Sequence, residues 1–362
     1  MVRAFAFALA LVWPLAVAAQ TSAQNSWDAV LAAAKKEGKV VVLGPPNTQM
    51  RQMLPAAFKA RYGITMDYLG GRNAEAAARL RAERQAGVNS VDAVLSGIDS
   101  MSSLFYREKM LDPLRPALML PEVLDGSKWK GGKLWFSDPE GQYALRLANS
   151  VSNMFHINTN YVKPGELKSA QDLLDPKWKG RIALEDPMVT GSGSGHAAHL
   201  YLQLGGEFIR KLYIDQKPLL SRDSRILTDA LIRGTHPIVL GADDAEVEKM
   251  AKEGMPVALL QGFPDLYPEI SSGTSILGIL NNAPHPNAAK VFVNWMASKE
   301  GGELYSRARG AASTRNDIDE SFLDPDVIPR EGVKYFDNHD WEYTVTKKEE
   351  ARQRVKEILQ PR

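Results

Sequence analysis

The chain has 362 residues, a formal net charge of +1, no cysteine and 8% aromatic residues. Because the charges balance, neither nucleic acid nor a membrane surface is an expected partner. The lack of cysteine excludes disulfide frameworks, thiolate metal sites, a cysteine nucleophile and a lipid-anchored N-terminal cysteine. The length suffices for two domains of ordinary size.

The first 23 residues have the order typical of a secretory signal peptide. One basic residue, Arg3, precedes an apolar run over residues 4–12, and small residues gather over residues 16–23. The run is too short to cross a bilayer of about 30 Å, so cleavage between residues 18 and 23 is expected rather than anchoring. We therefore expect an exported, soluble periplasmic protein that acts as a monomer.

Strand and helix patterns alternate along the rest of the chain, as in open α/β sheets with helices on both faces. Helices are predicted over residues 26–38, 74–85, 191–204 and 288–296, and a further helix follows the loop at 45–48 and ends near residue 62. Strands are predicted over residues 39–44, 64–70, 91–97, 153–158, 181–186, 236–242, 256–261 and 274–280.

The most informative segment joins the strand at 181–186 to the helix at 191–204 through a glycine-serine loop. Its sequence is Gly191-Ser192-Gly193-Ser194-Gly195, and Ser192 or Ser194 is the expected N-cap. The unpaired amides and the dipole at such a helix start would stabilise a carboxylate, phosphate or sulfate. A glycine loop is a weak motif by itself, so an ordinary flexible connection is the alternative.

Other candidate ligand residues follow predicted strands, where ligands bind in open α/β sheets. Arg72 could hold an anion with two parallel hydrogen bonds, or could pair with Glu75 or Asp67. Asp243 and Asp244 could accept from a hydroxyl or ammonium group, or could serve as helix-capping acids. Two further candidates, Asn47 and Gly97, lie in the loops after the first and third predicted strands.

Several segments of the chain resemble the periplasmic solute-binding proteins of ABC importers. The most specific are LLDPKWKG at residues 173–180 and PHPNAAKVFVNWMASKEG at residues 284–301. The family includes ferric-ion, thiamine, phosphonate and phosphorylated-sugar binders. The resemblance implies a type II α/β fold of two lobes, each a doubly wound sheet, hinged by crossing strands. The lobes are expected to close on a solute in the cleft and present it to a permease in the inner membrane.

On the pattern of this family, lobe one is expected over residues 25–152 with 268–318, and lobe two over 153–267 with 319–362. The resemblance also implies that the turn Gly193-Ser194-Gly195 binds an anionic group and that Ser224 adds a polar contact. The paired tyrosines of ferric binders correspond to Asp244 and Ala245 here. Direct capture of iron is therefore not expected, and neither a metal site nor a cofactor is predicted.

The expected solute is a small organic anion, such as a phosphorylated sugar, a phosphonate or a carboxylate. One alternative is a cationic solute, thiamine or a polyamine, held by the aspartates and stacked on an aromatic ring. The candidate rings are Trp135, Tyr143, Trp178 and Tyr267. A second alternative is ferric ion bound through an anion.

A secreted hydrolase is the alternative from another class of protein. The chain contains neither a phosphate-binding G-x-x-x-x-G-K-[ST] loop nor an H-E-x-x-H motif. His196 and His199 lie one helical turn apart, but the sequence offers no third metal ligand. No catalytic residue is therefore predicted. The mixed charges of residues 347–356 are expected to form the solvated face of a terminal helix.

Overall fold

The computed structural model describes residues 26–360, except residues 72, 153, 190–191 and 261. The chain divides into two compact units, each built from two separate stretches of sequence. The first unit comprises Met1–Asn149 with Ser272–Leu323, and the second comprises Ser150–Ser271 with Asp324–Arg362. The expected signal peptide lies outside the described residues, and none of the described helices is long and apolar enough to cross a membrane.

The first unit is built on a six-stranded mixed sheet with the strand order β2-β1-β3-β13-β4, in which β5 also pairs with β13. β1 pairs in parallel with β2 and β3, whereas β13 runs antiparallel to β3. The strands are β1 (Lys39–Gly44), β2 (Thr65–Gly70), β3 (Ala93–Ser96), β4 (Leu111–Asp112), β5 (Leu145–Arg146) and β13 (Ile276–Leu280). The α-helices of this unit include α2 (Thr48–Tyr62), α3 (Asn73–Gln85), α4 (Ile98–Ser100), α5 (Pro121–Leu124), α9 (Pro286–Ala297) and α10 (Lys299–Arg309). Residues 26–37 form a further helix.

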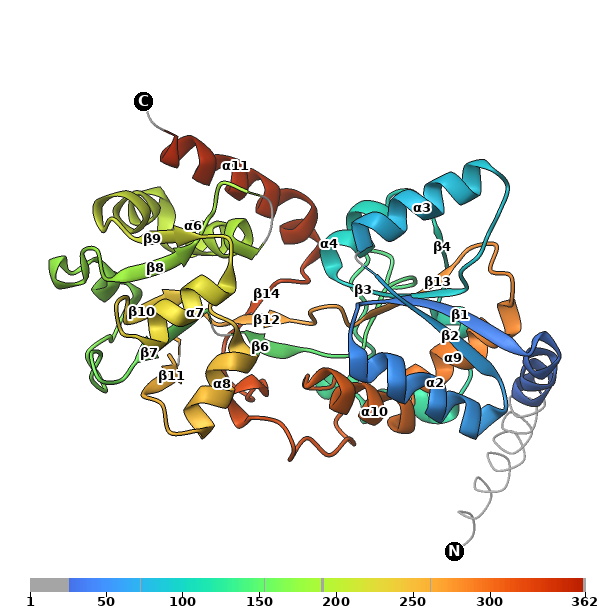
Figure 1. Ribbon diagram of the computed structural model, residues 1–362. Coiled ribbons are helices and arrows are strands. Elements are labelled where there is room, and N and C mark those ends of the chain that lie inside the picture. Colours follow the sequence, from blue (N-terminus) through green and yellow to red (C-terminus); the bar gives the residue numbers. More distant parts are fainter. Residues whose placement is uncertain (1–25, 72, 153, 190–191, 261, 361–362) are drawn as a thin grey trace, which may run out of the picture. The chain divides into compact units, whose positions relative to one another are not determined.

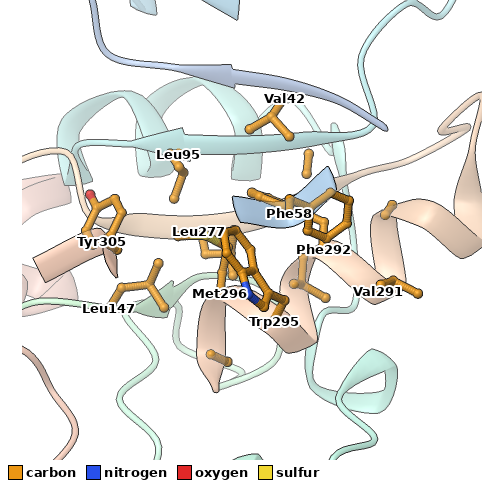
Figure 2. Packing of buried hydrophobic residues seen from close by; sticks show 14 of the residues in the cluster. Val42, Phe58, Leu95, Leu147, Leu277, Val291, Phe292, Trp295, Met296 and Tyr305 are labelled. Atoms are coloured by element: carbon orange, nitrogen blue, oxygen red, sulfur yellow. The ribbon is translucent and has the colours of Figure 1, made fainter. Parts of the chain in front are cut away.

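Helices cover both faces of this sheet, because side chains that alternate along its strands enter two different cores. Val42 packs with α2 and α9 in one core, while the next residue, Leu43, belongs to the core on the opposite face. In the first core the ring of Phe58 lies 6.0 Å from that of Phe292 and 5.3 Å from that of Trp295 (Figure 2). Figure 1 shows α2 and α9 on one side of the strands and α3 on the other.

The second unit contains a five-stranded sheet in the order β11-β7-β10-β8-β9 and a small sheet in the order β14-β12-β6. The strands of the larger sheet are β7 (Phe155–Asn158), β8 (Ile182–Glu185), β9 (Leu219–Ser221), β10 (Ile238–Leu240) and β11 (Val257–Leu259). Those of the smaller sheet are β6 (Ser150–Ser152), β12 (Glu269–Ser271) and β14 (Phe336–Asp337). The helices are α6 (Ser192–Arg210), α7 (Ser224–Ile232), α8 (Asp244–Lys252) and α11 (Lys348–Leu359). Leu184 and Ala183 enter separate cores, so helices cover both faces of the larger sheet as well.

The predicted doubly wound α/β fold is confirmed. The strand predicted over residues 39–44 has the same bounds as β1, and the other predicted strands are present in a shorter form. The helix predicted to end at residue 204 is interrupted at Gly205, which has φ +83°, a value that glycine adopts readily. The chain passes from one unit to the other at residues 149–150, 271–272 and 323–324. The lobe limits were expected at 152–153, 267–268 and 318–319. The predicted strand over residues 153–158 forms β7, which lies inside the larger sheet of the second unit.

A buried arginine organises the end of the first unit. Arg315 is 2% exposed, and its Nε and Nη2 donate to the two carboxylate oxygens of Asp317, each at 2.8 Å. Its Nη1 donates to the carbonyl of Ala297 at 2.8 Å, so one guanidinium joins the end of α9 to the following chain. The hydrogen bonds from Arg315 hold the pKa of Asp317 below its usual range.

We expect Asp317→Asn to lower the free energy of unfolding by about 1–3 kcal/mol, because a nearly buried guanidinium loses the nearer of its two carboxylate partners, the other being Glu122 at 3.4 Å. Asp319→Asn is the control. That carboxylate is 59% exposed, and its ion pair with Arg307 is long, at 3.6 Å, so a change within about 0.5 kcal/mol is expected. Because the pKa of Asp317 is lowered in the folded protein, its contribution is present at neutral pH and is lost below about pH 4. Urea unfolding at pH 7 measures both variants, and equal losses would contradict the assigned role.

Candidate functional site

Three helices of the second unit start at one edge of its larger sheet. β8, β9 and β10 are parallel, so their carboxyl ends lie together, and α6, α7 and α8 each follow one of these strands (Figure 1). Helix starts carry unpaired amides and positive dipole ends, and ligands bind at this edge of open α/β sheets. This edge is therefore the candidate site within the second unit.

The start of α7 carries its own acidic cap. The Asp223 side chain accepts from the backbone amide of Arg225 at 3.0 Å and forms an ion pair with the Arg225 guanidinium. The hydrogen bond from that guanidinium lowers the pKa of Asp223. The carbonyl of Ser224, a predicted contact residue, accepts from the hydroxyl of Thr228 at 2.8 Å. The Asp223 carboxylate therefore already accepts a hydrogen bond from an otherwise unpaired amide at the start of α7.

The start of α8 is capped in the same way. The Asp243 side chain accepts from the amide of Glu246 at 3.0 Å, and the Asp243 amide donates to the Thr228 hydroxyl at 2.9 Å. Of the two roles considered for Asp243, the structure shows that of an N-cap. The side chain of Asp244 lies outside what the structure describes.

The start of α6 is different, because the sequence has a glycine instead of an aspartate immediately before Ser192, and the first turn has no acidic residue. Gly193 and Ser194 are buried there, and a Cβ built on Gly193 would lie 2.5 Å from the carbonyl oxygen of Asp186. The preceding strand supplies the carboxylate instead. The Ser192 hydroxyl donates to Oε1 of Glu185 at 2.6 Å, and Nδ1 of His196 lies 2.9 Å from Oε2.

The orientation of Glu185 requires a glycine far away in the sequence. Gly241, the residue after β10, has φ +94°, and a Cβ built on it would lie 2.1 Å from Cγ of Glu185. Any other residue would displace the carboxylate from the α6 start. The space beside Gly241 is therefore filled by Glu185, a residue that the sequence did not indicate as part of a site.

Two cations of α11 also face the α6 start. A Cβ built on Gly195 would lie 3.8 Å from Nη2 of Arg352 and 3.9 Å from Cε of Lys348. Lys348 is 6% exposed, and the Arg352 side chain is 14% exposed. The prediction that residues 347–356 form a solvated face is therefore wrong for one side of α11, because Ala351 and Val355 are buried on that side as well.

His199 lies one turn beyond His196, but its side chain is buried in the protein interior. It is fully buried, its Nε2 lies 2.6 Å from the side-chain nitrogen of Gln203, and its ring packs edge-on against Phe336 at 4.6 Å. Burial, with a smaller effect from His196, lowers the pKa of His199 to about 4, so the ring is neutral at pH 7. Within the described part of the chain, no group of three or more His, Asp or Glu residues could hold a metal ion.

Two predicted site residues of the first unit, Asn47 and Gly97, contact the protein backbone. The Asn47 side chain caps α2 by accepting from the amide of Met50 at 2.8 Å. Gly97 precedes α4, and a Cβ built on it would lie 3.1 Å from the carbonyl oxygen of Gly273. Arg72 lies outside the described residues.

The aromatic rings considered for a cationic solute are largely occupied. Trp178 is 2% exposed and lies in the core of the second unit. The ammonium of Lys334 lies 4.2 Å from the ring centre of Tyr267. Trp135 donates its ring N–H to the carbonyl of Lys130, and the Tyr143 ring packs against Tyr106.

Comparison with known proteins places these features in a family context. Residues 53–328 match the family described as bacterial extracellular solute-binding protein. An uncharacterised protein of Haemophilus influenzae is 23% identical over 291 residues, which is 76% of this chain and 78% of that protein. AfuA of Actinobacillus pleuropneumoniae, solved with fructose-6-phosphate, is a similar structure with a TM-score of 0.57 and 20% identity, covering 88% of this chain and 96% of that one. Iron-bound HitA of Pseudomonas aeruginosa has a TM-score of 0.61 and 17% identity, covering 89% and 99%.

Alanine at Gly193 and at Gly195 should have opposite effects on stability. Gly193→Ala places a methyl group against the Asp186 backbone and should lower the free energy of unfolding by about 1–3 kcal/mol. Gly195→Ala meets its nearest atoms at 3.8 Å and should raise it by roughly 0.5 kcal/mol, because alanine favours the helix. Chemical denaturation measures both, and a loss at Gly195 as large as that at Gly193 would contradict this packing.

The buried neutral His199 should make stability depend on pH. Its pKa is lower in the folded protein than in the unfolded chain, so stability is full above pH 6.5 and is lost as the pH falls towards 4. Between pH 7.5 and pH 5 this single group should remove about 2 kcal/mol. His199→Gln should abolish that part of the pH dependence in urea unfolding. His236→Gln should change it by less, because burial also lowers the pKa of His236 but that side chain is less deeply buried. An unchanged pH profile in His199→Gln would contradict the assignment.

Proposed function

We propose that this protein, which belongs to the bacterial extracellular solute-binding protein family, binds a small organic anion at the start of α6. The solute would then pass to an ABC permease, since proteins of this family serve ABC importers. The solute we propose is a phosphorylated sugar, a phosphonate or a hydroxylated carboxylate.

The observation that carries this proposal is the way the α6 start holds a carboxylate. The Ser192 hydroxyl and the His196 ring both contact Glu185, in a first turn that contains glycine, serine and no acid. Backbone amides at such a turn suit an anionic group. Glu185 itself is an acceptor for a hydroxyl or amine, so a solute with an anionic end and a hydroxyl or amine end complements both features.

A cationic solute is the second candidate, and Glu185 is also the observation that favours it. Its carboxylate packs against Gly241, which precedes the capping Asp243 by two residues. Against this candidate, Trp178 is buried and Tyr267 already contacts Lys334, so neither ring is well placed to stack on a cation.

Two further residues predicted from the sequence belong to the proposal, although the structure does not describe their side chains. Arg72 is proposed as a second anion-binding residue, and Asp244 as an acceptor for the polar end of the solute. Closure of the two lobes on the solute also stays a prediction. Ferric ion bound through an anion stays an alternative prediction.

A thermal-shift screen of residues 24–362 tests the proposal. The panel comprises sugar phosphates, phosphonates, carboxylates, thiamine, polyamines and ferric citrate. A ligand present at 100 times its dissociation constant should add about 2.7 kcal/mol to the free energy of unfolding. Shifts with anions support the proposal, and shifts with cations alone support the second candidate. Turnover of a panel compound would show a hydrolase, and no shift with any anion would contradict the proposal.

Glu185→Gln separates the two candidates. The amide keeps an acceptor but removes the negative charge, so an anionic solute should bind as well or better, while a cationic solute should bind about tenfold more weakly. Glu207→Gln is the matched control on α6, because the Glu207 side chain is 75% exposed. Calorimetry on the three proteins measures the difference, and weaker anion binding in Glu185→Gln together with retained cation binding would contradict this account.

A further inference from the structure

We infer that the first unit contains an anion-binding site of its own, in which Arg51 and Arg309 hold a carboxylate or phosphate group beside the Tyr68 phenol. The site lies at the carboxyl ends of β1, β2 and β3, which are parallel neighbours. The inference goes beyond the proposed function, because it places an anionic group on the first unit whether or not the start of α6 also binds one.

The ends of β1 and β2 carry glycines that make room for polar side chains. β1 ends at Gly44, where a Cβ would overlap the hydroxyl of Tyr68. That hydroxyl donates to the carbonyl of Pro45 at 2.9 Å, so the phenol is held over the strand end. β2 ends at Gly70, where a Cβ would lie 2.5 Å from Nη2 of Arg51. A side chain at either glycine would therefore displace the phenol or the guanidinium.

The second arginine lies beside the end of β3. A Cβ built on Gly97, the residue after β3, would lie 3.1 Å from the carbonyl oxygen of Gly273. Gly273 has φ +56°, and a Cβ built on it would lie 2.8 Å from Nη2 of Arg309. Arg309 is in the last turn of α10, and Arg51 is in the first turn of α2, a helix that packs against α10 (Figure 1). Two neighbouring helices therefore carry the two guanidinium groups to neighbouring strand ends.

Both guanidinium charges act on the Tyr68 phenol. Burial raises the pKa of Tyr68, and Tyr305 raises it further, whereas Arg309 and Arg51 lower it. Because β1 lies between β2 and β3 and adjacent strands are about 4.8 Å apart, the two outer strand ends are roughly 10 Å apart. A small organic anion can span that distance and contact both arginines.

Neither arginine is neutralised by an acidic partner. Within the part of the chain that the structure describes, neither Arg51 nor Arg309 forms an ion pair. The phenol of Tyr305 lies beside Arg309, but burial raises its pKa, so it carries no charge at pH 7. By contrast, Arg307, two residues earlier in α10, lies 3.0 Å from the carboxylate of Glu303. The charges of Arg51 and Arg309 are therefore available to a ligand.

Two carboxylates near these strand ends belong to the opposite face of the sheet. Arg51, Tyr68 and Asp67 line a groove of about 620 Å³, but Asp67 alternates with Tyr68 along β2 and so points to the other face. The segment that carries Asp99 is anchored by Ile98 in the core on that other face. The positive start of α2 and the negative end of α10 oppose each other. The two arginines therefore determine the sign of the charge at this site.

Two buried polar atoms beside Arg309 support a bound anion. Among the described residues, the Nε of Arg309 and the hydroxyl of Thr274 have no hydrogen-bond partner. The carbonyl of Thr274 accepts from the Tyr305 hydroxyl at 3.3 Å, so Thr274 is held beside the same phenol as Arg309. Buried donors are normally satisfied by protein, water or a ligand. An oxyanion has acceptors for both, and a guanidinium binds it through charge-assisted hydrogen bonds.

NMR of the arginine Nε–H and backbone amide groups locates the bound anion on residues 24–362. The titrants are inorganic phosphate, a hexose phosphate and citrate. We expect the Nε–H resonance of Arg309 to shift with at least one of these anions, because its buried donor gains an acceptor. The amide resonances of Ser192, Gly193 and Ser194 report separately on the start of α6.

Calorimetry with the anion that binds most tightly measures the contribution of each arginine. Arg309→Gln should weaken binding about tenfold, and Arg51→Gln about threefold, because Arg51 is more exposed and water screens its charge. Arg307→Gln on α10 and Arg61→Gln on α2 are the matched controls, since each of these arginines pairs with a glutamate of α10. Both controls should bind within about twofold of the wild-type protein.

The outcomes separate this inference from the proposed function. Shifts at Ser192–Ser194 without a shift at Arg309 would overturn this inference alone, and the reverse would overturn the proposed site at α6 alone. Shifts at neither place with any of the three anions would overturn both. If Arg309→Gln fails to fold by circular dichroism, Arg309→Lys should weaken binding about threefold, because lysine lacks the planar set of donors. Unchanged binding in both Arg309→Lys and Arg51→Gln would then overturn the inference.

Discussion

The contact between the Glu185 carboxylate and the start of α6 determines the shape of the candidate site. Glu185 ends β8, and its two oxygens meet Ser192 and His196 in the helix that follows. The contact is possible because Gly241, on the neighbouring strand end, has no side chain in the way. A strand end, a helix start and a distant glycine thus form one unit, and moving any of them would change the donors at the proposed site.

The same edge shows two ways of compensating a helix start. In α7 and α8 the N-cap aspartates Asp223 and Asp243 accept from the first-turn amides, so the compensation is local. In α6 the carboxylate comes from the preceding strand and bonds side chains, in a turn of glycine and serine. Local caps stabilise the fold, whereas this arrangement keeps a turn of small residues beside a carboxylate, which is where we propose that the solute binds.

The C-terminal segment completes the second unit rather than trailing from it. β14 pairs with β12, and α11 packs along α6, where a Cβ on Gly206 would lie 2.9 Å from Ile358. Burial of Val355 and Ala351 fixes the rotation of α11, and this rotation turns Lys348 and Arg352 towards Gly195. The apolar face of the helix therefore determines where its charges lie.

The sequence by itself determined the alternation of strands and helices, the family, and the link from β8 to α6, because hydrophobic period, glycine and caps are local signals. It could not predict β6, β12 and β14, which have two or three residues each and show no period. It left Asp243 undecided, since the same side chain can cap a helix or bind a ligand, and it did not indicate the capping role of Asn47. Only the tertiary structure decided that Lys348 is buried and that Glu185 meets the α6 start, because both depend on residues far away in the chain.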